Sequence, residues 1–286
     1  MISVLILTKN EEQDLPGCLE SVKWCDDIHV FDSFSEDLTL QIASKEGAKI
    51  TKRKFDNYAS QRNASLEVID FKYEWIFILD ADERIPNDLK IEIFNIIPNL
   101  NFSINGFRIQ RKDYLNEKWL KHAQMSAYYI RLIRRNKAKY HREINEVIEV
   151  DGEVLNLKNH FDHYPFSKGY SHWLNKHNNY SSMEAKRWLD EQNSSIEFSI
   201  KKAFFSSNFS EKRFHQKGLY YKMPFRPLIK WFYLLFIKKS FLDGYEGVTV
   251  ATLQSIYEYF IVLKTKELLL NKKFENNKIN CPNNKC

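Results

Sequence analysis

The segment from Trp75 to Arg84 constrains this chain most, because a wholly apolar run ends abruptly in two carboxylates, Asp80 and Asp82. Such a run is typical of a strand buried on both faces of a parallel sheet. Acids at its carboxyl end would lie where open α/β sheets bind ligands. Two carboxylates suit Mg²⁺ or Mn²⁺, and hence a substrate that carries phosphates. Alternatively, Asp82, Glu83 and Pro86 could begin an acidic helix N-terminus.

Three more apolar segments precede this strand, and helical patterns separate them. Residues 2–7, 28–31 and 47–50 are predicted strands. A helix with Asn10 as its N-cap is expected after the first strand, and a helix over residues 58–68 after the third. Strands that alternate with helices of this length predict right-handed crossovers and an α/β fold with a parallel sheet.

Five blocks occur in order in this part of the chain: residues 3–12, 18–22, 32–39, 61–64 and 79–84. Together they resemble the family 2 glycosyltransferases, and within that family the branch that adds sugars to the lipopolysaccharide inner core. The resemblance continues more loosely through His163-Tyr164 to residues 241–244. It implies the GT-A fold, with a Rossmann-like, mostly parallel sheet and flanking helices.

The resemblance also implies a nucleotide-sugar donor site, whose residues would be Thr8, Glu11, Asp32, Arg62, Asp80 and Asp82. Asp32 would accept a hydrogen bond from uracil, Asp80 would hold the ribose, and Asp82 would bind the metal, Mg²⁺ or Mn²⁺. Three of these residues have ordinary alternatives. Asp32 could cap the following helix, Glu11 could be a first-turn helix acid, and Arg62 could be an exposed helical arginine instead of a diphosphate contact.

An inverting transfer needs a base remote from the donor acids, which removes the proton of the acceptor hydroxyl. The family carries a His-Glu pair near this point of the chain, and alignment on Asp151-Gly152 places Glu146 on the base. Asn145 then occupies the usual histidine position, so either Asn145 orients the base or His141 replaces the missing imidazole. Glu143 is the alternative base, and a solvated strand face is the ordinary role of both acids.

Further candidates lie between and after these segments. His163 could contact the metal or the diphosphate, although a structural role is the commoner fate of such a histidine. Arg111, Trp119 and His122 are expected in an acceptor groove, because aromatic rings stack on sugars and cations meet core phosphates. The same residues could simply cover the edge of the sheet.

The C-terminal part combines basic and aromatic residues. Between residues 201 and 240 there are ten Lys or Arg residues and one acid, Glu211. The apolar run around Trp231 is too short for the ~20 residues of a transmembrane helix. We expect a basic amphipathic helical hairpin over residues 221–275 that binds an anionic membrane surface. Burial against the catalytic domain, or in a homodimer, explains the same residues.

These expectations define a domain plan and a location. Residues 1–220 would form the catalytic domain, with a donor half (1–100) and an acceptor half (101–220), and residues 276–286 a disordered polar tail. The first strand begins directly after Met1, so no signal peptide is expected. The four cysteines show neither zinc spacing nor a disulfide framework. A mean hydropathy of −0.51 excludes a polytopic membrane protein. A cytoplasmic protein, peripheral to the inner face of the cytoplasmic membrane, is therefore expected.

The combined expectation is an inverting, metal-dependent hexosyltransferase. It would use a UDP-sugar, with UDP-glucose the expected donor, and a lipid-linked lipopolysaccharide or lipooligosaccharide core acceptor. A polyprenyl-phosphate, capsule or O-antigen acceptor is the nearest alternative. A non-catalytic module that binds nucleotide or nucleic acid through the basic segment is the rival of another class. Asp80, Asp82 and Glu146 together argue against it, so no nucleic-acid partner is expected.

Overall fold

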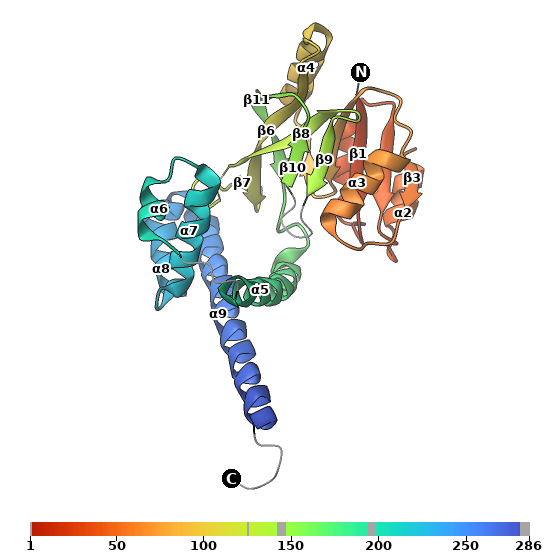
Figure 1. The fold of residues 1–286 in the computed structure, drawn as a ribbon. Coiled ribbons are helices and arrows are strands. Elements are labelled where there is room, and N and C mark those ends of the chain that lie inside the picture. Colours follow the sequence, from red (N-terminus) through yellow and green to blue (C-terminus); the bar gives the residue numbers. More distant parts are fainter. Residues whose placement is uncertain (1, 125, 142–146, 194–197, 281–286) are drawn as a thin grey trace. The chain divides into compact units, whose positions relative to one another are not determined.

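The computed structural model describes residues 2–124, 126–141, 147–193 and 198–280, and it divides the chain into two compact units (Figure 1). The first unit is Met1–Gly169 and the second is Tyr170–Cys286. The first unit therefore ends well before residue 220, the expected limit of the catalytic domain. The helices that follow Gly169 make their own contacts within the second unit, as when His177 packs against Tyr257.

A single mixed sheet forms the centre of the first unit. The predicted strands are present as β1 (Ser3–Thr8), β2 (Ile28–Asp32), β3 (Lys49–Lys52) and β4 (Trp75–Asp80), which are parallel in the order β3-β2-β1-β4. The sheet continues through β8 (Tyr128–Arg134), β6 (Ile104–Leu115), β11 (Glu153–His163) and β5 (Glu83–Arg84). Because β8 is antiparallel to both β4 and β6, the sheet is less parallel than the sequence predicted.

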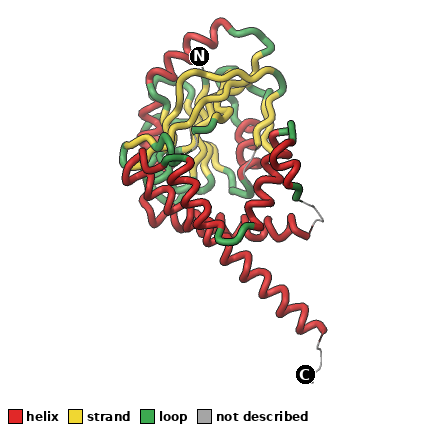
Figure 2. The backbone as a smooth tube through the Cα atoms, turned by 90° about the vertical axis from the view of Figure 1, so that its left-hand side faces the viewer, coloured by secondary structure: helices red, strands yellow, loops and turns green. Residues whose placement is uncertain are grey.

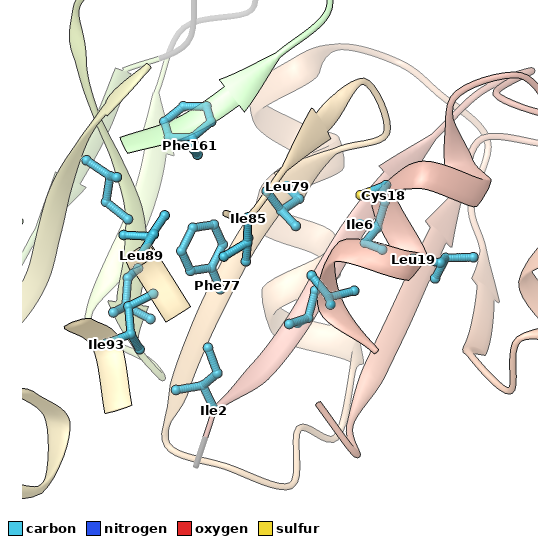
Figure 3. Packing of buried hydrophobic residues seen from close by; sticks show 14 of the residues in the cluster. Ile2, Ile6, Cys18, Leu19, Phe77, Leu79, Ile85, Leu89, Ile93 and Phe161 are labelled. Carbon is cyan, nitrogen blue, oxygen red and sulfur yellow. The ribbon is translucent and has the colours of Figure 1, made fainter. Parts of the chain in front are cut away.

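Helices cover one face of this sheet, and a helix with a hairpin covers the other. α1 (Leu15–Val22), α2 (Thr39–Lys45) and α4 (Asn87–Ile96) bury side chains in one apolar cluster, part of which is drawn in Figure 3. α3 (Tyr58–Val68) contributes to a second cluster with Tyr140 of the hairpin β9 (Ala138–His141) and β10 (Val147–Val150). Alternating side chains of β1 enter the two clusters, as expected for a strand covered on both sides.

The first helix begins later than the sequence predicted. Asn10 is not its N-cap: the backbone of Asn10 is left-handed (φ 56°), and α1 begins at Leu15 with Pro16 in its first turn. The side chain of Asn10 instead accepts a hydrogen bond from the Glu36 backbone N–H, and Ser35 Oγ accepts one from the Asn10 N–H. The loop after β1 is thereby tied to the loop after β2.

Strand β11 contains an irregularity where it pairs with β6. Asn156 lies opposite Arg108 and His160 opposite Gln110, so two extra residues of β11 are accommodated between these pairs. The Glu92 carboxylate of α4 accepts hydrogen bonds from the backbone N–H groups of Lys158 and Asn159, at 2.7 and 2.8 Å. These bonds satisfy donors that the sheet ladder leaves without a partner strand.

The second unit is helical (Figure 1). Its elements are α5 (Gly169–Asn193), α6 (Ile200–Phe205), α7 (Phe209–Lys222), α8 (Arg226–Phe232), a π-helical turn (Tyr233–Ile237), a 3₁₀ turn (Ser240–Asp243) and α9 (Gly244–Asn280). The chain turns at Gly244, whose φ is 70°. The C-terminal half of α9 extends beyond the other helices of its unit (Figure 2).

The C-terminal segment is thus helical, as expected. Within the described residues, no helix has an apolar stretch of the length that a bilayer crossing requires. Residues 276–280 continue α9, although the sequence predicted a disordered tail from residue 276, and the remainder of that tail lies outside the described residues.

Short additional elements complete the first unit: a 3₁₀ turn (Ile97–Asn99) and β7 (Lys118–Trp119), which pairs with the end of β6.

Candidate active site

Three of the predicted donor residues meet where parallel strands end. Thr8 pairs in register with Asp32, and Leu7 pairs with Asp80, so these positions share the carboxyl edge of β2, β1 and β4. This is the edge at which open α/β sheets bind ligands.

Asp32 is fully buried and already has hydrogen-bond donors from its own chain. Its Oδ2 accepts from Thr8 Oγ1 at 2.7 Å and from Ser35 Oγ at 2.5 Å, and its Oδ1 accepts from the Ser35 backbone N–H at 2.7 Å. Asp32 therefore caps the turn that follows β2, rather than helix α2 as the alternative interpretation had it. Its expected contact with uracil stays a prediction.

Asp80 is held between two guanidinium groups. Its Oδ1 accepts from Arg62 at 2.8 Å and its Oδ2 from Arg131 at 3.1 Å. Burial disfavours the charged form of Asp80, but the two cations outweigh it and hold the pKa of this carboxyl well below its usual range. Arg62 is 6% exposed, so it is not the exposed helical arginine that one alternative described.

Glu83 completes this buried network. Arg131 donates to one of its carboxylate oxygens, and the other accepts the backbone N–H of Asp80 at 2.9 Å. Burial and the neighbouring Asp80 carboxylate raise the pKa of Glu83. Glu83 thus lies in β5 and holds the backbone of Asp80. The helix that could have begun at Asp82 or Glu83 begins only at Asn87.

Asp82 faces His163 across the same edge. The Asp82 Oδ2 and His163 Nε2 atoms are 3.4 Å apart, and His163 Nδ1 pairs with the buried carboxylate of Asp113. Burial of His163 opposes its protonation, but Asp82 and Asp113 together raise its pKa to about 9. Arg111 pairs with Asp113 in turn, at 3.0 Å from Nε to Oδ1. The structure therefore brings together Asp82 and His163, the two residues expected at the metal, and their role as metal ligands stays a prediction.

This arrangement fits a divalent cation shared with a substrate. In carboxylate–histidine–metal triads, a carboxylate pairs with one imidazole nitrogen and fixes the ring so that the other nitrogen can bind the metal. Here Asp113 pairs with Nδ1, which leaves Nε2 for a metal. No group of three or more His, Cys, Asp or Glu side chains that could hold a metal occurs among the described residues. A cation bound by Asp82 and His163 would thus take further ligands from diphosphate oxygens and water, which is the usual coordination of Mg²⁺.

Glu11 lies near Asp82 and is paired with a lysine that the sequence reasoning did not single out. Lys168 Nζ is 2.8 Å from Glu11 Oε2 and also donates to the Asn10 carbonyl oxygen at 2.7 Å. Burial raises the pKa of Glu11 to about 7, although Lys168 opposes this shift. Glu11 precedes α1 by several residues, so it is not a first-turn helix acid.

Ser167, like Lys168, attaches the loop after β11 to the loop after β1. Ser167 Oγ donates to Asp14 Oδ2 at 2.9 Å, next to the Glu11–Lys168 pair. Both loops border the edge that carries Asp82. A basic residue shortly after His163-Tyr164 was the available sequence signal for Lys168.

The expected acceptor residues occupy different environments. Arg111 supports Asp113, as described above, and its guanidinium lies 4.7 Å from the Tyr129 ring centre. Trp119 lies on β7, with the ammonium of Lys112 at 4.3 Å from its ring centre. His122 follows β7 and is partly buried. The acceptor role of all three stays a prediction.

The expected base segment lies between β9 and β10 along the chain. Glu143, Asn145 and Glu146 lie outside the described residues, but the flanking strands pair His141 with Val147. The Asn63 side chain of α3 bonds to both the N–H and the carbonyl of Tyr140, at 2.8 Å each.

The same hairpin is close to Asp80 and contains a histidine–glutamate pair. Arg62 lies 5.5 Å from the Tyr140 ring centre, so β9 packs beside the Asp80 network. His141 Nε2 is 3.0 Å from Glu149 Oε2, which gives this imidazole a carboxylate partner within the hairpin.

Residues 3–164 match the model of the family described as glycosyl transferase family 2. The match covers more than half of the chain and includes the strands and acids described above. The chain belongs to the family 2 glycosyl transferases, and it is a glycosyltransferase. The resemblance inferred from the five sequence blocks is thereby confirmed.

Among similar proteins is the lipopolysaccharide core biosynthesis glycosyltransferase LpsC of Rhizobium meliloti, which is 26% identical over 92% of this chain and 91% of its own length. An uncharacterised glycosyltransferase of Rickettsia felis is 28% identical over 95% and 92%. Among solved structures, TarS (residues 1–349) of S. aureus in complex with UDP-GlcNAc has 14% identity and a TM-score of 0.47, over 92% of this chain and 89% of that one.

Proposed function

We propose that this glycosyltransferase transfers a hexose from a UDP-sugar to a lipid-linked oligosaccharide of the lipopolysaccharide-core type. One observation carries the donor part of this proposal. Asp82 and His163 face each other 3.4 Å apart, beside the doubly paired Asp80, at the edge where three parallel strands end. A diphosphate with a bound cation is the substrate group that such a carboxylate–imidazole pair suits.

The residues around Asp82 divide into binding and positioning roles. Asp80 would accept a ribose hydroxyl, and Arg62 and Arg131 fix the orientation of its carboxylate. Asp82 and His163 would hold Mg²⁺ or Mn²⁺, which supplies positive charge that stabilises the departing diphosphate. Asp113 and Arg111 keep the His163 ring in place.

Glu146 is the proposed general base. Attack of the acceptor hydroxyl on the anomeric carbon breaks the bond to the diphosphate, and the hydroxyl proton passes to a carboxylate on the opposite face of the sugar. Asp80 has both oxygens paired with arginines and a lowered pKa, so it is a poor base for this step. The hairpin that carries Glu146 packs beside that network through Tyr140 and Arg62, which supports the proposal.

The proposed acceptor is supported by the relative LpsC, whose name states a role in lipopolysaccharide core biosynthesis. The second unit adds a basic, apolar surface between Lys222 and Tyr245. Among its exposed side chains are Phe225 (77%), Ile237 (71%) and Tyr245 (74%). Exposed apolar groups next to lysines suit an anionic membrane surface, where a lipid-linked acceptor resides. We therefore propose a peripheral location at the inner face of the cytoplasmic membrane. A polyprenyl-phosphate, capsule or O-antigen acceptor would use the same surface.

A screen of UDP- and GDP-sugars tests the donor assignment. A ligand at about 100 times its dissociation constant raises the free energy of unfolding by about 2.7 kcal/mol, so thermal unfolding with and without Mn²⁺ reports binding directly. We expect metal-dependent protection by a UDP-sugar, followed by UDP release when acceptor is added. Protection by GDP-sugars alone would overturn the uridine assignment.

A further inference from the structure

The second unit contains an apolar cavity of about 810 Å³ that the proposed sugar transfer does not use. Its walls come from Trp188, Tyr221, the segment 223–228, and the face of α9 that carries Ile256, Tyr259 and Val262. This volume is within the range of sites that bind small organic molecules.

The charges that line the cavity have one sign. Arg226 and Lys266 are both lining residues, and no carboxylate is among them. An apolar wall with cations and no anion complements a molecule with a hydrocarbon part and a negative group.

Arg226 has unused hydrogen-bonding capacity. It is only 4% exposed, its Nε is 2.9 Å from Glu258 Oε1, and its Nη1 donates to the Tyr221 carbonyl oxygen at 3.2 Å. Its Nη2 has no hydrogen-bond partner within the described part of the chain. A buried donor without an acceptor is costly, so an oxygen supplied by a ligand would be stabilised there.

Several of the apolar side chains that line the cavity are also exposed. Met223, Phe225, Leu228 and Tyr259 are 47%, 77%, 57% and 51% exposed. The backbone of Phe225 is left-handed (φ 52°), a conformation that bulky residues rarely adopt. Strain of this kind persists where the surrounding structure imposes it, and it is common at binding sites.

We propose that this cavity binds one hydrocarbon chain of an anionic membrane lipid, with the lipid phosphate at Arg226 and Lys266. The site goes beyond the proposed sugar transfer, because it recognises a lipid through the second unit whether or not that lipid is the acceptor. A single hydrocarbon chain is the expected occupant because a volume of about 810 Å³ is that of a site for one small organic molecule.

Binding of single-chain lipids to the full-length protein tests this proposal, by calorimetry below the concentration at which they form micelles. The probes are oleoyl lysophosphatidate, monoolein, which lacks the phosphate, and glycerol 3-phosphate, which lacks the chain. We expect one lysophosphatidate bound per protein chain. Monoolein should bind at least about tenfold more weakly, and glycerol 3-phosphate should show no measurable binding. Equal affinity for glycerol 3-phosphate and lysophosphatidate would show a free-phosphate site and overturn the proposal.

Two variants locate the binding. Val262→Trp places an indole in the cavity and should weaken lysophosphatidate binding at least about tenfold, or about 1.4 kcal/mol. Val248→Trp, on the same helix but outside the lining, is the matched control and should bind normally. Unchanged binding by a folded Val262→Trp variant would overturn the proposal, as would absence of lysophosphatidate binding in the wild type.

Lys266→Gln gives an independent measurement on an exposed side chain, which does not endanger the fold. The ratio of lysophosphatidate to monoolein affinity should fall several-fold, because monoolein has no charge to lose. If Val262→Trp instead dissociates a dimer that ignores all three probes, the cavity is an interface between copies of the chain and the lipid proposal is wrong.

Discussion

Arg131 of β8 and Asp80 of β4 form an ion pair of 3.1 Å between strands that run in opposite directions. Arg131 also contacts Glu83. Asp80 is the last residue of β4 and Glu83 the first residue of β5, and Asp82 lies in the turn between these strands. The antiparallel strand inserted next to β4 therefore supplies the buried cation that keeps the first acid of the motif ionised and oriented.

Removal of this cation should be strongly destabilising. Arg131→Met would remove the cation that Asp80 and Glu83 share, and loss of one partner of a buried ion pair typically costs about 3–5 kcal/mol. Urea unfolding measures the loss. Arg134→Met is the matched control on the same strand, because its partner Glu74 is 61% exposed and such pairs contribute about 0–1 kcal/mol. Equal losses in the two variants would contradict the assignment of Arg131.

Asp82→Asn should remove the metal-dependent part of UDP-sugar binding while the fold is retained. The amide keeps the shape of the side chain but lacks the charge that a hard cation requires. Thermal unfolding with UDP-sugar, in Mn²⁺ and in chelator, should give the same midpoint for this variant. Asp70→Asn, at a 98% exposed side chain, should keep the wild-type response. Full turnover of Asp82→Asn with metal present would show that the metal role is wrong.

Glu146→Gln should lower kcat by roughly 10² to 10⁴ with little change in donor affinity, as expected for loss of a general base. Glu143→Gln is the matched control and should have a far smaller effect. Initial rates of UDP release at saturating donor and acceptor distinguish them. The opposite ranking would assign the base to Glu143.

Lys238 and Lys239 should contribute to binding of anionic vesicles. Both are exposed, whereas Lys230 lies 3.5 Å from Glu258 and is less available to lipid than the sequence suggested. The double replacement by Gln should weaken vesicle sedimentation at low salt, and high salt should weaken the wild type, because charges are screened over about 10 Å at 0.1 M. Lys201 and Lys202, changed in the same way, give a control with equal loss of charge. An equal effect in the control would show that vesicle binding depends on the total positive charge of the protein and not on a specific surface.

His177 should make the second unit less stable as the pH falls below neutrality. Its ring stacks on Trp173 at 3.5 Å, and burial together with Lys176 and Lys230 lowers its pKa to about 4. Above about pH 6.5 the imidazole is neutral in both states, so its stabilising contribution is complete. Between pH 6.5 and 4 the unfolded chain binds a proton that the folded chain does not, at up to about 1.4 kcal/mol per pH unit.

Thermal unfolding midpoints across that pH range test this expectation. His177→Phe keeps an aromatic ring that cannot be protonated, so its midpoint should fall less than that of the wild type. His172→Phe changes an exposed histidine one turn earlier and should retain the wild-type decline. Parallel pH profiles for all three proteins would contradict the prediction.

The strands and acids of the donor half could be predicted because their signals are local. The run from Trp75 to Leu79 is buried throughout, and an uninterrupted apolar run has one simple explanation in an α/β chain. Helix 58–68 was predicted at its observed bounds because Asn57 provides a real cap, accepting from the Ser60 N–H at 2.8 Å.

Long-range pairings were beyond the sequence. Asn10 has the residue type of an N-cap, but contacts with Ser35 and Glu36 hold it in a left-handed turn. Arg131 and Asp113 are buried charges whose partners are distant along the chain. Only strand order brings such residues together, and strand order was not readable from local pattern.

The number of residues in the irregular part of β11 determines on which side of the sheet His163 lies. Side chains alternate along a strand, so an even insertion leaves every later side chain on its original side, whereas loss of a single residue among 157–159 would turn His163 away from Asp82 and Asp113. Glu92 holds the inserted backbone in place from α4. The position of His163 beside Asp82 therefore depends on the parity of a segment that lies earlier in the same strand.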